Sequence, residues 1–276
     1  MRPARLLATF AAHAALAAGA VVMLLPFWWM LLTAFRPPEE IFTGGIALFP
    51  ERFHGLANFD QALTSAPFLR FMLNGVIVCA GILAVQLAVA IPAAYALAKL
   101  SFPGHRLLFA AVVGAIAIPI QVPALPLYLA FAELRLLNTY FALMFPFFLS
   151  VFAIFLLRQV FKQYPDEIIQ AARLDGAGEF EIVWRFVVPA AAPAIAAFSI
   201  FSVVAHWNDL YWPLIVITET RLAPPPLGML FFRDAETGSN YGALMAGATM
   251  ITAPLVLAFL VARRRFIQGI TMTGLK

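Results

Sequence analysis

The stretch "DEIIQAARLDGAGEFEIVWRFVVP", residues Asp166 to Pro189, carries seven charged residues among 24, in a chain that is otherwise apolar almost throughout. Of the 276 residues, 63% are hydrophobic and 12% are charged, and the mean hydropathy is +0.91. An ordinary soluble domain carries about 25% charged residues. The composition therefore indicates a membrane protein, and the charged stretch is a segment that leaves the membrane.

On both sides of this stretch, apolar runs alternate with short charged interruptions. A helix needs about 20 apolar residues to cross a bilayer, and these runs are too long and too continuous for the alternating strands of a barrel. The sequence predicts an all-α membrane protein with a single transmembrane domain over residues 1–276. About six membrane-spanning helices are expected, at residues 7–35, 71–98, 107–132, 139–161, 193–218 and 241–262.

The distribution of basic residues predicts the orientation of these helices. With an even number of spans, only six of the 18 Lys and Arg residues fall in the loops on one side, namely Arg36, Arg52, Arg70, Arg135, Arg221 and Arg233. The side with more Lys and Arg normally faces the cytoplasm. Both termini and the loop at residues 162–190 are therefore expected in the cytoplasm.

The loop itself reads as two short helices joined at residues 174–178. Asp166 can cap the first helix, and Gly176 can adopt the left-handed conformation that ends it. The second helix should begin after Gly178. Apolar residues at helical spacing predict which faces pack on other elements: Ile168, Ala171 and Ala172 in the first helix, and Phe180, Val183, Trp184 and Val187 in the second.

Three interpretations of the loop follow from these residues. A DNA-binding helix-turn-helix has a similar outline, but the loop lies between two spans and has no soluble domain around it. An ordinary structured connection is the second interpretation. A rigid element that docks into the groove of a partner protein is the third, because an apolar stripe outside the membrane favours a binding partner.

The loop also resembles the "EAA" motif of permeases from ATP-binding cassette (ABC) transporters. In that motif Glu-Ala-Ala is followed at fixed spacing by Gly and then by Pro. Gln170 stands where the motif has Glu, and Asp175 precedes the glycine as in many sugar importers. The residues at the motif positions are Gln170, Ala171, Ala172, Asp175, Gly176 and Pro189.

The resemblance extends to other segments, namely "LLNTYFALMFPFFLSVFAIFLLRQVF" (136–161), "WNDLYWPLIVI" (207–217) and "RRRFIQGITMTGLK" (263–276). These are similar to the carbohydrate-uptake family of type I ABC importers, and in particular to the smaller permease subunit of the maltose and glycerol-3-phosphate systems. The resemblance implies a multi-pass permease of the bacterial cytoplasmic (inner) membrane. It also implies a sugar, polyol or glycerol phosphate as substrate, lipid around the spans and no nucleic acid.

The chain lacks the phosphate-binding sequence Gly-x-x-x-x-Gly-Lys-Ser/Thr, so nothing in it is expected to hydrolyse ATP. The resemblance implies that an ABC ATPase dimer binds ATP and Mg, that a second permease completes the translocation path, and that an extracytoplasmic solute-binding protein delivers the substrate. No catalytic residue and no cofactor is then expected in this chain. Gln170–Gly176 would be the coupling helix that fits into the ATPase.

Polar residues inside apolar spans are candidates for the substrate pathway, since polar groups are costly there. Gln121 lies among prolines that bend the third span, and it either faces the pathway or bonds to a neighbouring helix. Asn208 and Asp209 lie in the outer part of the fifth span. They either contact substrate or anchor the span at the membrane surface beside aromatic residues.

An ion-coupled secondary transporter is the alternative function. That class needs carboxylates near the middle of the membrane or an inverted repeat, and Asp209 is the one strong candidate carboxylate. An enzyme is not expected, since no catalytic motif is present. The four His residues are scattered without the spacing of metal ligands, so no metal site is expected.

Overall fold

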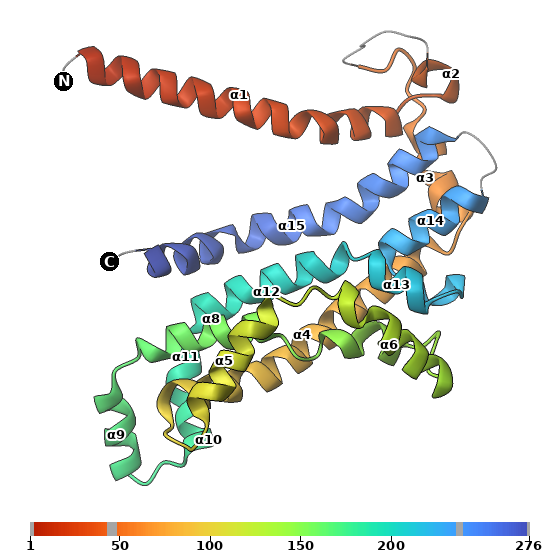
Figure 1. Ribbon diagram of the computed structural model, residues 1–276. Coiled ribbons are helices and arrows are strands. Elements are labelled where there is room, and N and C mark those ends of the chain that lie inside the picture. Colours follow the sequence, from red (N-terminus) through yellow and green to blue (C-terminus); the bar gives the residue numbers. More distant parts are fainter. Residues whose placement is uncertain (1–2, 43–48, 236–239, 275–276) are drawn as a thin grey trace. The chain divides into compact units, whose positions relative to one another are not determined.

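A computed structural model describes residues 3–42, 49–235 and 240–274 of the chain (Figure 1). Within those residues the structure consists of helices and their connections, with no β-strand. The all-α class is therefore confirmed. Three helices are long, and their bounds are α1 (Pro3–Ala34), α4 (Phe68–Lys99) and α15 (Tyr241–Gly274).

Each long helix contains a segment that is long and apolar enough to cross a membrane, and these segments are Thr9–Ala34, Phe68–Lys99 and Tyr241–Leu260. Three further crossings are possible if each of three bent helix pairs counts as one span, giving up to six within the described residues. The expected number of about six is consistent with this count. The pairs are bent by 95°, 44° and 81° at residues 117–120, 148–150 and 191, respectively.

The first bent pair replaces the straight helix expected at residues 107–132. Helix α5 (His105–Ile116) ends before Pro119, and α6 (Gln121–Glu133) begins after it. Proline has no backbone N–H and clashes with the preceding turn, so it breaks the helix here. A helix of this length extends only about 20 Å, which is shorter than the ~30 Å hydrocarbon core. The proline bend was expected, whereas its extent was not.

The expected helix at residues 193–218 is also interrupted. It consists of α12 (Ala192–Trp207) and α13 (Tyr211–Val216), separated by residues 208–210. The remaining elements of the described chain are α2 (Pro38–Ile41), α3 (Gly55–Thr64), α7 (Tyr140–Met144), η1 (Phe145–Phe147), α8 (Val151–Lys162), α9 (Asp166–Leu174), α10 (Glu179–Ile182), η2 (Val183–Val187), α11 (Val188–Ala190), η3 (Thr220–Leu222) and α14 (Pro225–Ala235).

The chain divides into two compact units. The first comprises Met1–Leu69 and Met229–Pro254, and the second comprises Arg70–Gly228 and Leu255–Lys276. In the first unit, the buried amide of Asn58 donates to the backbone carbonyls of Ala34 (3.0 Å) and Arg36 (2.8 Å). Asn58 thereby holds α3 against the end of α1.

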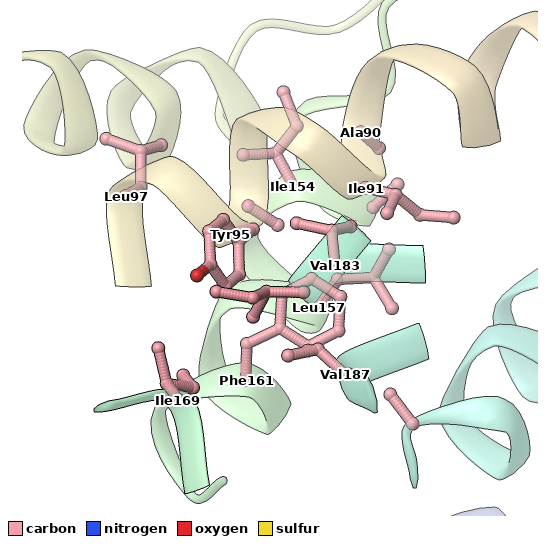
Figure 2. Packing of buried hydrophobic residues seen from close by; sticks show 14 of the residues in the cluster. Ala90, Ile91, Tyr95, Leu97, Ile154, Leu157, Phe161, Ile169, Val183 and Val187 are labelled. Carbon is pink, nitrogen blue, oxygen red and sulfur yellow. The ribbon is translucent and has the colours of Figure 1, made fainter. Parts of the chain in front are cut away.

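The second unit contains an apolar cluster of buried residues, which we call the loop-end cluster. It brings together the Lys99 end of α4, helix α8 and the charged loop (Figure 2). Its members are Ala90, Ile91, Ala94, Tyr95, Leu97, Ala153, Ile154, Leu157, Phe161, Ile169, Ala172, Ile182, Val183, Val187, Ala191 and Phe198. In Figure 1, α9 and α10 lie at one end of this unit and α6 and α13 at the other.

Asn74 organises the opposite part of the second unit. Its fully buried amide donates to the carbonyls of Arg221 (3.0 Å) and Ala223 (2.9 Å), and its Oδ1 accepts a hydrogen bond from the Tyr140 hydroxyl at 2.6 Å. One side chain of α4 therefore joins α7 to the segment that precedes α14. Polar side chains inside apolar spans commonly connect helices in this way.

Replacing Asn74 by leucine is expected to lower the free energy of unfolding by about 3 kcal/mol, because buried carbonyls and a hydroxyl lose their partner. Tyr140→Phe removes only one of the three hydrogen bonds and should cost about 1 kcal/mol. Thermal unfolding of the purified variants in detergent measures both. Equal losses in the two variants would contradict a central role for the Asn74 amide.

Candidate coupling site

The charged loop begins with helix α9, and its ends are defined by local chemistry. Asp166 and Glu167 lie in the first turn and Arg173 in the last, where they complement the helix dipole. At the other end Gly176 has φ +88°, and the N–H groups of Gly176 and Ala177 donate to the carbonyls of Arg173 (3.0 Å) and Ala172 (2.9 Å). This is a Schellman motif, which needs the left-handed conformation at its glycine. The expected end of the helix at Gly176 is confirmed.

The second segment of the loop begins after Gly178, as expected, with Glu179 and Glu181 in its first turn. It continues as a π-helix over Val183–Val187, in which the Val188 N–H donates to the Val183 carbonyl. Pro189 follows directly and has no N–H to continue an α-helical ladder. Pro189 therefore lies at the start of the short helix α11.

The face of α9 that packs on the bundle differs from the expected one. Ile169 and Ala172 are 2% and 7% exposed, whereas Ile168 is exposed at 43% and Ala171 is also exposed. The expected face of Ile168, Ala171 and Ala172 was therefore wrong, except for Ala172. Both faces have helical spacing, so periodicity alone could not separate them. The position of α4 and α8 selects the one that is buried.

The expected stripe of the second segment is also only partly correct. Val183 and Val187 are buried, together with Ile182, but Phe180 is 77% exposed and Trp184 is 40% exposed. The π turn adds a residue to the helical repeat, which moves side chains away from the expected 3.6-residue face. Phe180 and Trp184 instead contact each other, with ring centroids 6.0 Å apart.

Lys99, at the end of α4, ties the start of α9 to the bundle. Its Nζ donates to the backbone carbonyl of Tyr164 at 2.5 Å and to Asp166 Oδ1 at 2.6 Å. The side chain of Lys99 is only 5% exposed, while that of Asp166 is 70% exposed. A buried ammonium group is stable only with such partners, so the tie places Asp166 at the entrance to α9.

Glu179 ties the end of α9 to the start of the second segment and to α4. Arg173 donates from Nε to Glu179 Oε1 (2.6 Å) and from Nη2 to Oε2 (3.2 Å), and the Tyr95 hydroxyl donates to the same Oε2 at 2.6 Å. The hydrogen bond from Arg173 lowers the pKa of the Glu179 carboxyl, partial burial opposes this, and the Tyr95 hydrogen bond lowers it further. Glu179 is therefore held as a carboxylate.

Gln170 lines a small hollow of about 170 Å³ together with Lys99, Asp166 and Arg173. The two cations beside it are already paired with Asp166 and Glu179. Gln170 is neutral, whereas the motif has Glu at this position. The charges around it therefore cancel, with Lys99 paired to Asp166 and Arg173 paired to Glu179. Asp175 and Gly176 are exposed at the turn, and Pro189 is exposed at the far end of the loop.

The sequence did not single out Tyr95, Lys99 or Glu179 as parts of this site. Tyr95 and Lys99 are four residues apart and so share a helix face. This spacing can be recognised in the sequence, but it does not indicate which residues outside α4 they contact. Their partners lie 84 and 67 residues further along the chain. Contacts over such separations depend on how the chain folds, so no local sequence pattern predicts them.

The three candidate pathway residues lie in two places. The Asn208 amide donates to the Val204 carbonyl of its own helix at 2.8 Å, and Asp209 Oδ1 accepts the backbone N–H of Trp212 at 3.4 Å. Both side chains thus support the break between α12 and α13. Gln121 is the exposed first residue of α6. These two hydrogen bonds of Asn208 and Asp209 go to Val204 and Trp212, and neither involves Gln121.

Residues 86–271 match the family described as "Binding-protein-dependent transport system inner membrane component". The match covers more than half of the chain and includes the whole loop. The chain therefore belongs to this family of transport permeases, which are integral membrane proteins and not enzymes. The expected resemblance is confirmed, and nothing in the comparisons supports an ion-coupled secondary transporter.

The chain is similar over almost its whole length to permease proteins of two transport systems. It is 32% identical to the arabinooligosaccharides transport system permease protein AraQ of Halalkalibacterium halodurans, covering 93% of this chain and 92% of that one. It is 28% identical to the sn-glycerol-3-phosphate transport system permease protein UgpE of Escherichia coli, covering 95% of each.

A solved structure has the same fold. It is a chain from the crystal structure of a bacterial ABC transporter involved in the import of the acidic polysaccharide alginate, with a TM-score of 0.80 and 22% identity. The likeness covers 96% of this chain and 98% of that one. The expected type I importer permease fold is therefore confirmed.

Proposed function

We propose that this chain is a permease subunit of an ATP-driven importer for a sugar or a related polyol or glycerol phosphate. The family match over residues 86–271 carries this proposal. The substrate class is inferred from relatives named for arabinooligosaccharides and sn-glycerol-3-phosphate. Residues 1–276 would act as one permease domain in a bacterial inner membrane, with both termini and the charged loop in the cytoplasm.

In this proposal the loop transmits force from an ABC ATPase dimer, which binds ATP and Mg. Four large apolar side chains of the loop are exposed, namely Ile168, Leu174, Phe180 and Trp184. Exposed apolar groups outside a membrane favour a protein partner. The Schellman motif and the ties of Lys99 and Glu179 give the loop the rigidity that force transmission needs. Gln170–Gly176 would then be the part that enters the ATPase.

A second permease and an extracytoplasmic solute-binding protein would complete the importer. The pathway residues proposed here are Gln121, Asn208 and Asp209. Asn208 and Asp209 support this role through their position at a helix break, because interrupted helices inside a membrane occur where they line a cavity. Gln121 also follows a helix break.

Reconstitution of this chain with the ATPase, second permease and binding protein from its own system tests the proposal. Substrate uptake into proteoliposomes should require ATP and the binding protein. Uptake by this chain alone in response to a proton or sodium gradient would contradict it.

A further inference from the structure

Tyr95 and Lys99 lie one helical turn apart on α4. Lys99 is bonded to Asp166 at the start of α9, and Tyr95 is bonded to Glu179 of α10, which pairs with Arg173 near the end of α9. We propose that α9 and the Lys99 end of α4 move as one rigid body during transport, with Tyr95 and Lys99 as positioning residues that carry the displacement into the membrane. This inference rests on the proposed function, because it assumes that α9 receives the force.

The first anchor is at the start of α9. Lys99 is buried, so its ammonium group has few alternatives to the Tyr164 carbonyl and the Asp166 carboxylate that it contacts. Breaking this pair would leave the buried ammonium group with only the Tyr164 carbonyl as a partner, which is costly. A movement of Asp166 away from α4 is therefore resisted.

The second anchor is at the end of α9. Glu179 accepts hydrogen bonds from Arg173 of α9 and from Tyr95 of α4 through the same oxygen, Oε2. The carboxylate thus joins both helices at one atom. The bonds to Glu179 from Arg173 Nε and from the Tyr95 hydroxyl are both 2.6 Å long, and charge-assisted hydrogen bonds are directional, so they oppose sliding as well as separation.

Apolar contacts fill the space between the two anchors. Ile169 and Ala172 of α9 belong to the same cluster as Ala94 and Leu97 of α4, and Figure 2 shows Ile169 and Tyr95 in this cluster. Helix α8 also contributes to the cluster through Leu157 and Phe161. Apolar contact is non-directional and permits sliding. The two polar anchors, both of which end on α4, therefore make α4 the helix that must follow α9.

The first test removes the anchors separately and together. In the complete importer reconstituted in proteoliposomes, Tyr95→Phe and Lys99→Met should each lower the amount of substrate imported per ATP by about fivefold, and the double variant by more than about tenfold. Co-purification of the ATPase and its basal ATP hydrolysis are measured in the same preparations, so that a loss of transport per ATP is distinguished from a loss of binding. Glu181→Gln is the matched control, because Glu181 is bonded to Arg185 within its own segment. It should transport normally.

The second test restores one anchor covalently. In a Cys79→Ala background, the pair Lys99→Cys and Asp166→Cys should transport poorly, and a short bifunctional thiol reagent that links the two cysteines should restore transport. Restoration distinguishes rigid-body movement from a merely structural role, because the link replaces the tie but not the charges. If the link instead blocks transport, α9 must move relative to α4 and the inference is wrong.

These results separate the inference from the proposed function. If Tyr95→Phe, Lys99→Met and their double variant transport like the unmodified importer, the anchors carry no displacement and the inference fails. The proposed function fails instead if the reconstituted importer shows no uptake that depends on ATP and the binding protein.

Discussion

Gly176→Pro is expected to abolish binding-protein-stimulated ATP hydrolysis and substrate uptake while the chain remains in the membrane. Gly176 has φ +88°, whereas proline is restricted to about −65°. Proline also removes the N–H that donates to the Arg173 carbonyl at 3.0 Å. The end of α9 and the start of the second segment would then lose their fixed orientation, and the motion of the ATPase would no longer reach the spans.

Two alanine variants control for this prediction. Gly176→Ala keeps the N–H but must hold a side chain at positive φ, which costs about 1 kcal/mol, so coupling should be weakened rather than lost. Gly178→Ala lies two residues away at φ −75° with open space around its Cβ, and it should be silent. Membrane fractions, ATPase rates and uptake are measured for all three. Normal coupling in Gly176→Pro would show that the turn does not transmit force.

Leu174→Asp is expected to release the ATPase from the permease. Leu174 ends α9 and is 90% exposed, so a charge there should not disturb the fold of this chain. In a docked complex the same side chain would be desolvated, and a buried unpaired carboxylate is strongly unfavourable. The affinity for the ATPase should fall by at least about tenfold.

Co-purification of the ATPase with the tagged permease, followed by titration of its affinity, measures this loss. Leu174→Met preserves the apolar contact and should behave like the unmodified chain. The unfolding temperature of the isolated permease should be the same in both variants. Full retention of the ATPase by Leu174→Asp would place the docking surface elsewhere on the molecule.

In the loop, the ends of the helices could be predicted from the sequence, whereas their buried faces could not. The two short helices, the turn at Gly176 and the start after Gly178 were predicted, because caps and left-handed glycines are local chemistry. The buried faces were predicted poorly. Ile169 was missed and Phe180 was wrongly placed on the packed face, since the packing of α4 and α8 chooses between equally spaced faces.

In the spans, likewise, the number of crossings was predictable from the sequence, whereas the bends between helices were not. Continuous apolar runs were enough to predict an all-α membrane protein and about six crossings, because the bilayer sets the length of apolar chain that a helix needs. Prolines were expected to bend the third span, but the 95° break between α5 and α6 could not be predicted, because a proline pattern does not give the size of the bend.

The amino-acid sequence is thus sufficient for the class of the protein and the outline of its loop, which depend on apolar runs and on residues within a turn or two of one another. The folded chain alone reveals that Lys99 holds the start of α9 and that Tyr95 holds Glu179, which pairs with Arg173 near the end of α9. Their partners Glu179 and Asp166 lie 84 and 67 residues away, and such pairs form only when packing brings distant helices together.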